Sequence, residues 1–193
     1  MTAQPYAERL RAECWTVAPL EHAEAAPFIE QWHYARGCSN TCVYAFGLRH
    51  VALPSLYGVT MWLPPTRVAA ESVNRDQWQK VLSLSRMAVH PVVPKNACSF
   101  MLARAVRRIR AEARFVSLVT YADESQGHEG DVYRACGWKY VGKTGPYLRW
   151  VDPTTGRQVA SQATTTRSVA EMEDLGYVRS GRFYKHKFVL HLN

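Results

Sequence analysis

The segment from residue 99 to residue 138 constrains the fold more than any other part of the chain. Residues 99–113 carry apolar side chains at helical spacing, and residues 115–121 follow as a continuous β-branched and aromatic run. Such a run is typical of a central strand buried on both faces. A polar loop with two glycines then leads into a short helix, residues 131–136, that ends at Gly137. This order predicts an α/β fold with its chemistry at the end of the central strand.

Spacing and alternation elsewhere predict further elements. Helices are expected at residues 5–13, 21–32 and 171–175, with an interruption at Pro27. Strands are expected at residues 14–19, 42–48, 56–63, 82–89, 138–141 and 182–192, and a hairpin is expected from residues 147–151 and 157–160. No composition shift marks a boundary, so residues 1–193 are predicted to form a single domain.

Composition excludes several classes of protein. A hydrophobic content of 47% with 6 Trp and 10 Tyr predicts a packed core rather than a disordered chain. Five scattered cysteines argue against a disulfide framework and favour a reducing cytoplasm. No run approaches the roughly 18 apolar residues that a membrane span needs, so no membrane partner is expected. The net charge of +8 favours a polyanionic partner.

Four side chains are candidates for catalysis. Asp123 follows the buried strand, where open sheets carry functional carboxylates, and the alternative is an N-cap. Tyr133 lies one turn into the next helix, and the alternative is a tyrosine of the core. His33 and Tyr34 leave a predicted helix, where capping and packing would explain them without any function. His128 lies between two glycines, and a surface position is as well supported as a role.

A second group of residues is predicted to bind a donor or substrate. Arg86 stands in an apolar strand, where an arginine is costly unless it is paired or faces a cleft. Both an anion contact and a structural ion pair satisfy that condition. Lys95, Asn96 and Ser99 lie in the turn and first helical turn that follow, where an anion can bind. A solvated lysine and an ordinary capping residue are the alternatives.

Basic side chains suggest a phosphate-binding surface. Only Glu112 interrupts the arginines of the helix at residues 99–113. Contacts with phosphates would give affinity that falls steeply with salt, whereas a merely solvated face would not. The residues predicted to contact nucleic acid are Arg104, Arg107, Arg108, Lys139 and Lys143.

Four motifs in order resemble the Mom family of phage DNA-modification proteins. They are His33-Tyr34, residues 84–89, residues 96–99 and residues 123–133. The wider order of strand, turn, helix and strand resembles the GNAT acyltransferases, which implies an α/β (α+β) fold with a central mixed, mostly antiparallel sheet flanked by helices. The chain departs from the GNAT pattern in the donor loop, because residues 93–99 contain no glycine. The acyl donor is therefore left open between acetyl-CoA and another activated donor.

The resemblance implies an enzyme that transfers a methylcarbamoyl (carbamoylmethyl) group to N6 of adenine in DNA. This modification would protect phage DNA from restriction, in the cytoplasm of the infected bacterial host. The implied partner is double-stranded DNA with the adenine flipped out, and a homodimer is also expected. The implied metal is iron (Fe²⁺), held by residues that also carry the catalysis: His33, Tyr34, Asp123 and Tyr133.

Trp32, Tyr34, Trp62 and Tyr147 are candidates for stacking on a flipped base. Two other functions are kept as alternatives. One is a GNAT-type N-acyltransferase that acts on aminoacyl-tRNA, a protein or a small-molecule amine. The other is an inactive nucleic-acid-binding module on the same scaffold.

Overall fold

The main sheet has seven strands and confirms the predicted fold class. The computed structural model describes residues 9–159, 164 and 166–192. In the described residues β4 and β5 are parallel, and every other neighbouring pair is antiparallel. The strands, in the order in which they pair, are β1 (Trp15–Pro19), β2 (Tyr44–His50), β3 (Leu56–Leu63), β4 (Val81–Val89), β5 (Ser117–Asp123), β9 (Lys185–His191) and β6 (Lys139–Lys143).

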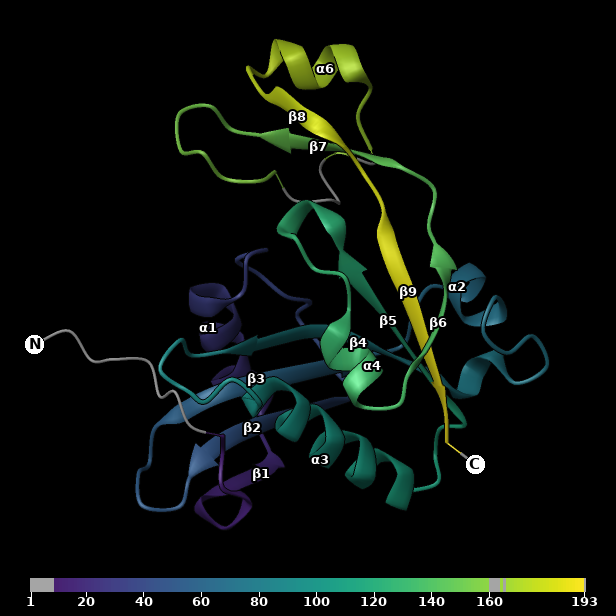
Figure 1. The fold of residues 1–193 in the computed structure, drawn as a ribbon. Helices are drawn as coiled ribbons and strands as arrows, with labels where there is room; N and C mark the ends of the chain where they lie inside the picture. The colour runs from purple at the N-terminus through teal and green to yellow at the C-terminus, as the bar shows by residue number, and fades with distance from the viewer. Residues whose placement is uncertain (1–8, 160–163, 165, 193) are drawn as a thin grey trace, which may run out of the picture.

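Two helices cover opposite faces of this sheet (Figure 1). Side chains alternate between the faces of a strand, and the two core clusters follow that period. Met61 of β3 packs in the cluster that includes α1 (His22–Trp32). Its neighbour Trp62 packs in the cluster that includes α3 (Ala97–Ala111). The helices thus bury both faces of the central strands, as the sequence predicts.

The helix α3 forms because its apolar side chains share one face. Its buried residues are Ala97, Met101, Leu102, Ala105, Val106 and Ile109. Leu102, Ala105 and Ile109 thus share the buried face at helical spacing, as the sequence predicts, while Cys98 is only half-buried. The helix begins at Ala97, two residues earlier than predicted, and the Asn96 carbonyl accepts the Phe100 N–H at 2.9 Å. The chain therefore enters α3 directly from the turn after Pro94.

The strands β4 and β5 pair over a short stretch and then separate. Their register joins Val81 to Ser117 and ends where Ser83 meets Val119. Beyond that point β4 continues along β3, and β5 continues along β9. The Thr120 Oγ1 donates a hydrogen bond of 3.2 Å to the Leu84 carbonyl and closes the base of the split. A gap in the backbone ladder thus lies at the centre of the sheet.

After Lys143 the chain leaves the main sheet and forms a separate substructure, which we call the arm. It consists of β7 (Tyr147–Val151), α6 (Val169–Asp174) and β8 (Val178–Phe183). The strands β7 and β8 form their own two-stranded sheet. Figure 1 shows the arm projecting beyond the end of the main sheet, with the chain returning through β9.

Of two predictions for this region, one is confirmed in part and the other is wrong. In the predicted hairpin, Val151 bridges Gln158, the Asp152 N–H donates to the Arg157 carbonyl and the Val159 N–H donates to the Trp150 carbonyl, each at 2.9 Å. The long pairing of β7, however, is with β8. The predicted terminal strand 182–192 is two strands in different sheets, which separate at Tyr184. The Tyr184 backbone turns away to bond with Glu124, a long-range contact that alternation along the strand does not reveal.

The other elements differ little from expectation. The helix α1 continues through Pro27, because Phe28 and Ile29 of the next turn are buried and hold it against the sheet. Of the predicted helix 5–13, residues 5–8 lie outside the described residues, residues 9–11 are not helical, and a 3₁₀ turn begins only at Ala12. The remaining short helices are α2 (Arg67–Glu71) and α4 (Asp131–Ala135), with 3₁₀ turns at Ala12–Cys14, Trp78–Lys80 and Glu124–Gln126. In the described part of the chain, every helix is too short or too polar to cross a bilayer.

Candidate active site

A cavity of about 500 Å³ opens where β4 and β5 separate. Its walls come from the end of α1, the second half of β4, the end of β5 and the loop that leads into α4. The split therefore gathers segments that are far apart in sequence. The predicted site residues that line this cavity are His33, Tyr34, Arg86, Asp123, His128 and Tyr133.

His33 is a buried, neutral imidazole at the end of α1. Its side chain is 8% exposed, and its Nδ1 accepts the Ala35 backbone N–H at 3.1 Å. Burial lowers the pKa of His33 from 6.5 to about 4, and the neighbouring Arg86 and His128 side chains act in the same direction. Its ring lies 4.3 Å from that of Tyr34, centroid to centroid.

This shift predicts a dependence of stability on pH. Since the folded state holds His33 neutral, the unfolded chain binds more protons between pH 6.5 and about 4. The contribution of His33 to the free energy of unfolding is therefore fully present above pH 6.5 and is lost as the pH falls to about 4. The loss is about 2–3 kcal/mol. Denaturant unfolding at pH 7, 5.5 and 4 in the presence of a chelator measures it against His33→Asn, whose carbonyl oxygen can still accept the Ala35 N–H. Parallel curves for both proteins would contradict this assignment.

Tyr34 extends from the same turn towards the carboxylate. Tyr34 as a whole is 39% exposed, but its hydroxyl group is buried. That burial is the main cause that raises the pKa of the hydroxyl, and the charge of Asp123 is the second. The guanidinium of Arg86 opposes this shift. The ring also contacts His128 edge to face, with 5.9 Å between the centroids. The glycine loop thus brings His128 to the site although its side chain is exposed.

Asp123 is the buried carboxylate of the cavity and is 4% exposed. It caps the 3₁₀ turn that follows, because Oδ1 accepts the Ser125 backbone N–H at 3.0 Å. The same oxygen accepts a hydrogen bond from the Tyr147 hydroxyl. Both alternatives from the sequence are therefore present together: the carboxylate is an N-cap and it also faces the cavity.

Tyr133 lies at the back of the cavity and is 9% exposed. Its ring packs between Trp138 and Phe188, at centroid distances of 5.9 and 5.3 Å. Burial raises the pKa of the Tyr133 hydroxyl, and a side-chain hydrogen bond with Thr120 opposes the shift. The hydroxyl is therefore protonated at neutral pH, the state that a proton donor requires.

Arg86 is held by backbone carbonyls. Its Nε donates to Gly37 O and its Nη1 to Ser85 O, each at 2.8 Å. Among the described residues no carboxylate forms an ion pair with Arg86, so its charge acts on the cavity instead.

The other predicted donor residues lie outside the cavity wall, although the neighbouring Cys98 lines it. The Asn96 side chain accepts the Leu10 backbone N–H at 2.6 Å. The Ser99 hydroxyl donates to the Asn96 carbonyl at 3.0 Å, and Lys95 is exposed.

The predicted nucleic-acid contacts are divided between two places. Arg104, Arg107 and Arg108 lie along α3, which begins at the cavity and runs away from it. Lys139 and Lys143 lie on the edge strand β6, and Lys143 forms an ion pair of 3.2 Å with Glu124. Lys143 therefore lies beside the turn that carries Asp123, whereas Lys139 pairs with Val189 further along β9.

The residue types at the site suit the implied metal in part. A neutral imidazole and oxygen donors are ligands that iron accepts, and His33, Tyr34 and Asp123 provide them along the cavity. The buried Tyr133 hydroxyl is engaged with Thr120. Within the described ranges there is no group of three or more His, Cys, Asp or Glu placed to hold a metal ion. The predicted set contains one His and one Asp, and the rest are phenols.

Sequence reasoning missed Gln126 and Thr120, which also line the cavity. Of the residues predicted to stack on a flipped base, Trp32 lines the cavity as well. Trp62 is fully buried in the core and donates to Thr60, so it is not available for a flipped base. Tyr147 donates to Asp123, a contact between residues 24 apart that no local pattern indicates.

The sequence and the fold are both similar to known proteins. The chain is 30% identical over 145 residues to methylcarbamoylase Mom of Escherichia phage Mu, which aligns 70% of this chain with 54% of that protein. The chain thus spans about half the length of that relative.

Solved structures with a similar fold are N-acetyltransferases. The ribosomal-protein-S18-alanine N-acetyltransferase of Escherichia coli matches with a TM-score of 0.56 and 14% identity, over 93% of this chain and 94% of that chain. The spermidine N-acetyltransferase of Vibrio cholerae, in complex with CoA and spermine, matches with a TM-score of 0.55 and 10% identity, over 93% and 96%. These likenesses confirm the predicted GNAT-like fold. The Mom protein family matches residues 14–193, and the chain therefore belongs to that family.

Proposed function

We propose that this protein is a transferase that attaches a methylcarbamoyl (carbamoylmethyl) group to N6 of adenine in DNA. The observation that carries the proposal is a single cavity at the β4–β5 split that contains Asp123, His33, Tyr34 and Tyr133 in a chain of the Mom family. The relative from phage Mu is named a methylcarbamoylase, which supports the nature of the transferred group. The same reasoning makes double-stranded DNA the partner and the cytoplasm of the infected host the place of action.

The proposed reaction uses a base and an acid on opposite sides of the transferred group. As the adenine N6 attacks, a bond forms between N6 and the transferred carbon, and the bond from that carbon to the leaving group breaks. The carboxylate of Asp123 accepts the proton that N6 loses. The Tyr133 hydroxyl donates its proton to the leaving group. The raised pKa of Tyr133 and the burial of Asp123 support these two roles.

The adenine must leave the base stack to reach a buried carboxylate. Trp32 and Tyr34 line the cavity and are proposed to stack on the flipped base. Arg86 is proposed to stabilise negative charge on the donor, because its guanidinium is held at the cavity wall without a carboxylate partner among the described residues.

The donor is proposed to enter from the α3 side of the cavity. The similar spermidine N-acetyltransferase was solved with CoA, which makes acetyl-CoA one candidate donor for this chain. Lys95, Asn96 and Ser99 surround the start of α3 and are proposed to contact the more distant part of the donor. A homodimer is a further part of the proposal.

The iron (Fe²⁺) of the family resemblance would be held by His33, Tyr34 and Asp123. It would polarise the donor or supply a redox centre when bound. We assign Tyr133 to proton donation instead, because a phenolate bound to a metal has no proton to give.

The proposal is tested by producing the protein in bacteria and analysing the nucleosides of digested plasmid DNA by mass spectrometry. A modified deoxyadenosine, absent from cells with the empty vector, is the expected result. Unmodified DNA from cells that contain folded protein would contradict the proposal. The second candidate, an N-acyltransferase acting on another amine, would then lead, because the similar acetyltransferase was solved with CoA and the amine spermine.

Phosphate contacts give a further prediction. The logarithm of the affinity for duplex DNA should fall linearly with the logarithm of the salt concentration. Removing Arg107 and Arg108 together should reduce the slope by about 2, since each lost phosphate contact contributes about 0.9. Fluorescence anisotropy at several salt concentrations measures it. The control is Arg67→Ala, on the exposed α2 helix, where Arg67 pairs with Glu71. An unchanged slope in the double variant would remove these two arginines from the interface.

A further inference from the structure

The turn that follows Asp123 is held by the arm. The Tyr147 hydroxyl of β7 donates to Asp123 Oδ1 and lies 3.1 Å from Ser125 Oγ. Arg149, also of β7, donates from Nη1 to the Ser125 carbonyl at 3.1 Å. Gln126 donates to Gln158 at 3.2 Å. Tyr147, Arg149 and Gln158 therefore all contact residues within three positions of the carboxylate.

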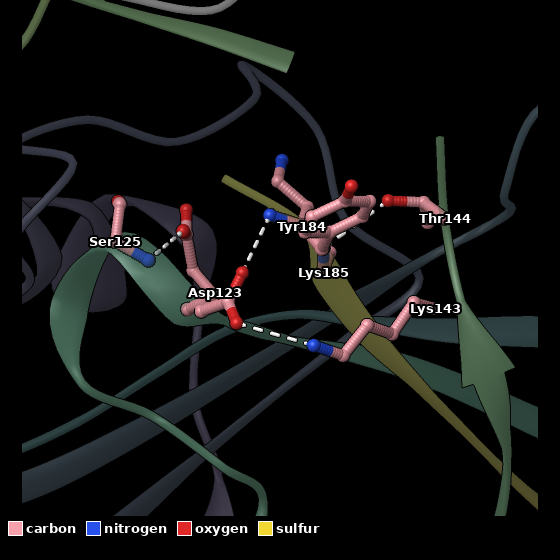
Figure 2. Close-up of polar contacts among 7 residues, drawn as sticks. Asp123, Ser125, Lys143, Thr144, Tyr184 and Lys185 are labelled. Atoms are coloured by element: carbon pink, nitrogen blue, oxygen red, sulfur yellow. Dashed lines mark hydrogen bonds and ion pairs between the residues drawn. The ribbon is translucent and has the colours of Figure 1, made fainter. Parts of the chain in front are cut away.

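The base of the arm holds the same turn from its other side. Glu124 accepts the Tyr184 backbone N–H at 2.9 Å and pairs with Lys143, where the chain enters and leaves the arm (Figure 2). Thr144 and Lys185 join the two crossing segments, as the Thr144 N–H donates to the Lys185 carbonyl at 2.9 Å. Figure 2 shows Tyr184, Lys185, Thr144 and Lys143 grouped on one side of the turn between Asp123 and Ser125.

The direction of the hydrogen bond between Tyr147 and Asp123 follows from chemistry. A phenol hydroxyl carries a proton to donate, and a carboxylate oxygen is an acceptor, so the Tyr147 hydroxyl donates the hydrogen bond to Asp123 Oδ1. Two donors, the Tyr147 hydroxyl and the Ser125 N–H, converge on the same oxygen of Asp123. Together these two hydrogen bonds fix the rotation of the Asp123 carboxylate about its Cβ–Cγ bond.

We propose that Tyr147 is a positioning residue that orients Asp123 for proton removal from the adenine amine. The site is then complete only when the arm is seated on the Asp123 turn. This inference rests on the proposed function, in which Asp123 is the base. Tyr147 acts through Asp123 and does not stack on the base, which replaces the stacking role considered from the sequence.

Tyr147→Phe isolates the hydroxyl. The ring can keep its contact with Phe183 and its place beneath the Lys185 ammonium, at 6.5 and 5.1 Å. We expect kcat to fall about 10-fold or more, since misplacement of a reacting group by about 1 Å costs up to 10²-fold. KM for duplex DNA and the affinity for duplex should stay unchanged. The matched control is Tyr184→Phe, because Tyr184 contacts Glu124 through its backbone.

The assay compares the steady-state kcat and KM of wild-type protein, Tyr147→Phe and Tyr184→Phe, with the thermal midpoint of each protein recorded. An inactive wild-type protein would refute the proposed function itself. With an active wild-type protein, an unchanged kcat in Tyr147→Phe would overturn the positioning role and leave the function intact. A rise in KM or a loss of DNA affinity without a fall in kcat would make Tyr147 a DNA contact, and this too would overturn the inference.

Discussion

Replacing Asp123 with asparagine should reduce adenine modification by about 10²–10⁴-fold, the range that a general base contributes. Asparagine keeps the shape of the side chain and can still accept the Ser125 N–H that caps the 3₁₀ turn. It cannot take up the proton from N6. The expected loss therefore appears in kcat, while the thermal midpoint and the affinity for duplex DNA change little.

The measurement is the yield of modified deoxyadenosine over time in DNA treated with purified protein. Glu129→Gln is a matched control, because it makes the same change from acid to amide at an exposed residue of the following loop, on the wall of the same cavity. Full activity of the Asp123→Asn protein would exclude Asp123 as the base. An equal loss in both proteins would show that the change in charge, rather than the base, is responsible.

Gly130→Ala should strongly destabilise the protein. Gly130 has φ +86°, and a Cβ built there would lie 2.2 Å from Cε2 of Phe188. Phe188 is fully buried between the sheet and α4 and cannot retreat without repacking the core. The left-handed backbone and the overpacking together should cost about 2–5 kcal/mol. The substitution should also displace Tyr133, whose N–H bonds to the Gly130 carbonyl at 3.0 Å.

The control is a substitution of the other glycine in the same loop, Gly127. Gly127 has φ +69°, but a Cβ there would meet nothing within 4 Å. Gly127→Ala should therefore carry only the cost of the backbone conformation, about 1–2 kcal/mol. Denaturant unfolding of both variants separates the two contributions. Equal losses would contradict the predicted clash with Phe188.

The sequence predicts the elements of this fold well wherever local pattern decides them. The strand β3 has the predicted bounds of 56–63, and α1 differs by one residue, because alternation and helical spacing are properties of neighbouring residues. The division of 182–192 into β8 and β9 could not be predicted, since both halves alternate equally well. The break at Tyr184 depends on Glu124, 60 residues away.

The same reasoning applies to the site. The polar loop after the central strand indicates Asp123 and Tyr133, and the family motif adds His33 and Tyr34; all four line one cavity. Which partner orients each of them is a property of the folded chain. The contact of Arg86 with Gly37 spans 49 positions, and no local spacing rule connects those two residues.

The position of β9 has a consequence for how the chain is made. The strand β9 lies between β5 and β6, yet it consists of Lys185–His191 and is synthesised after both of its neighbours. Until it emerges from the ribosome, the backbone groups of β5 on that side have no strand to pair with. A nascent chain stopped before residue 185 would thus expose the open edge of its central strand, the kind of surface on which partly folded chains aggregate. The long-range pairing of β5 with β9 is accordingly expected to be a late and slow step of folding.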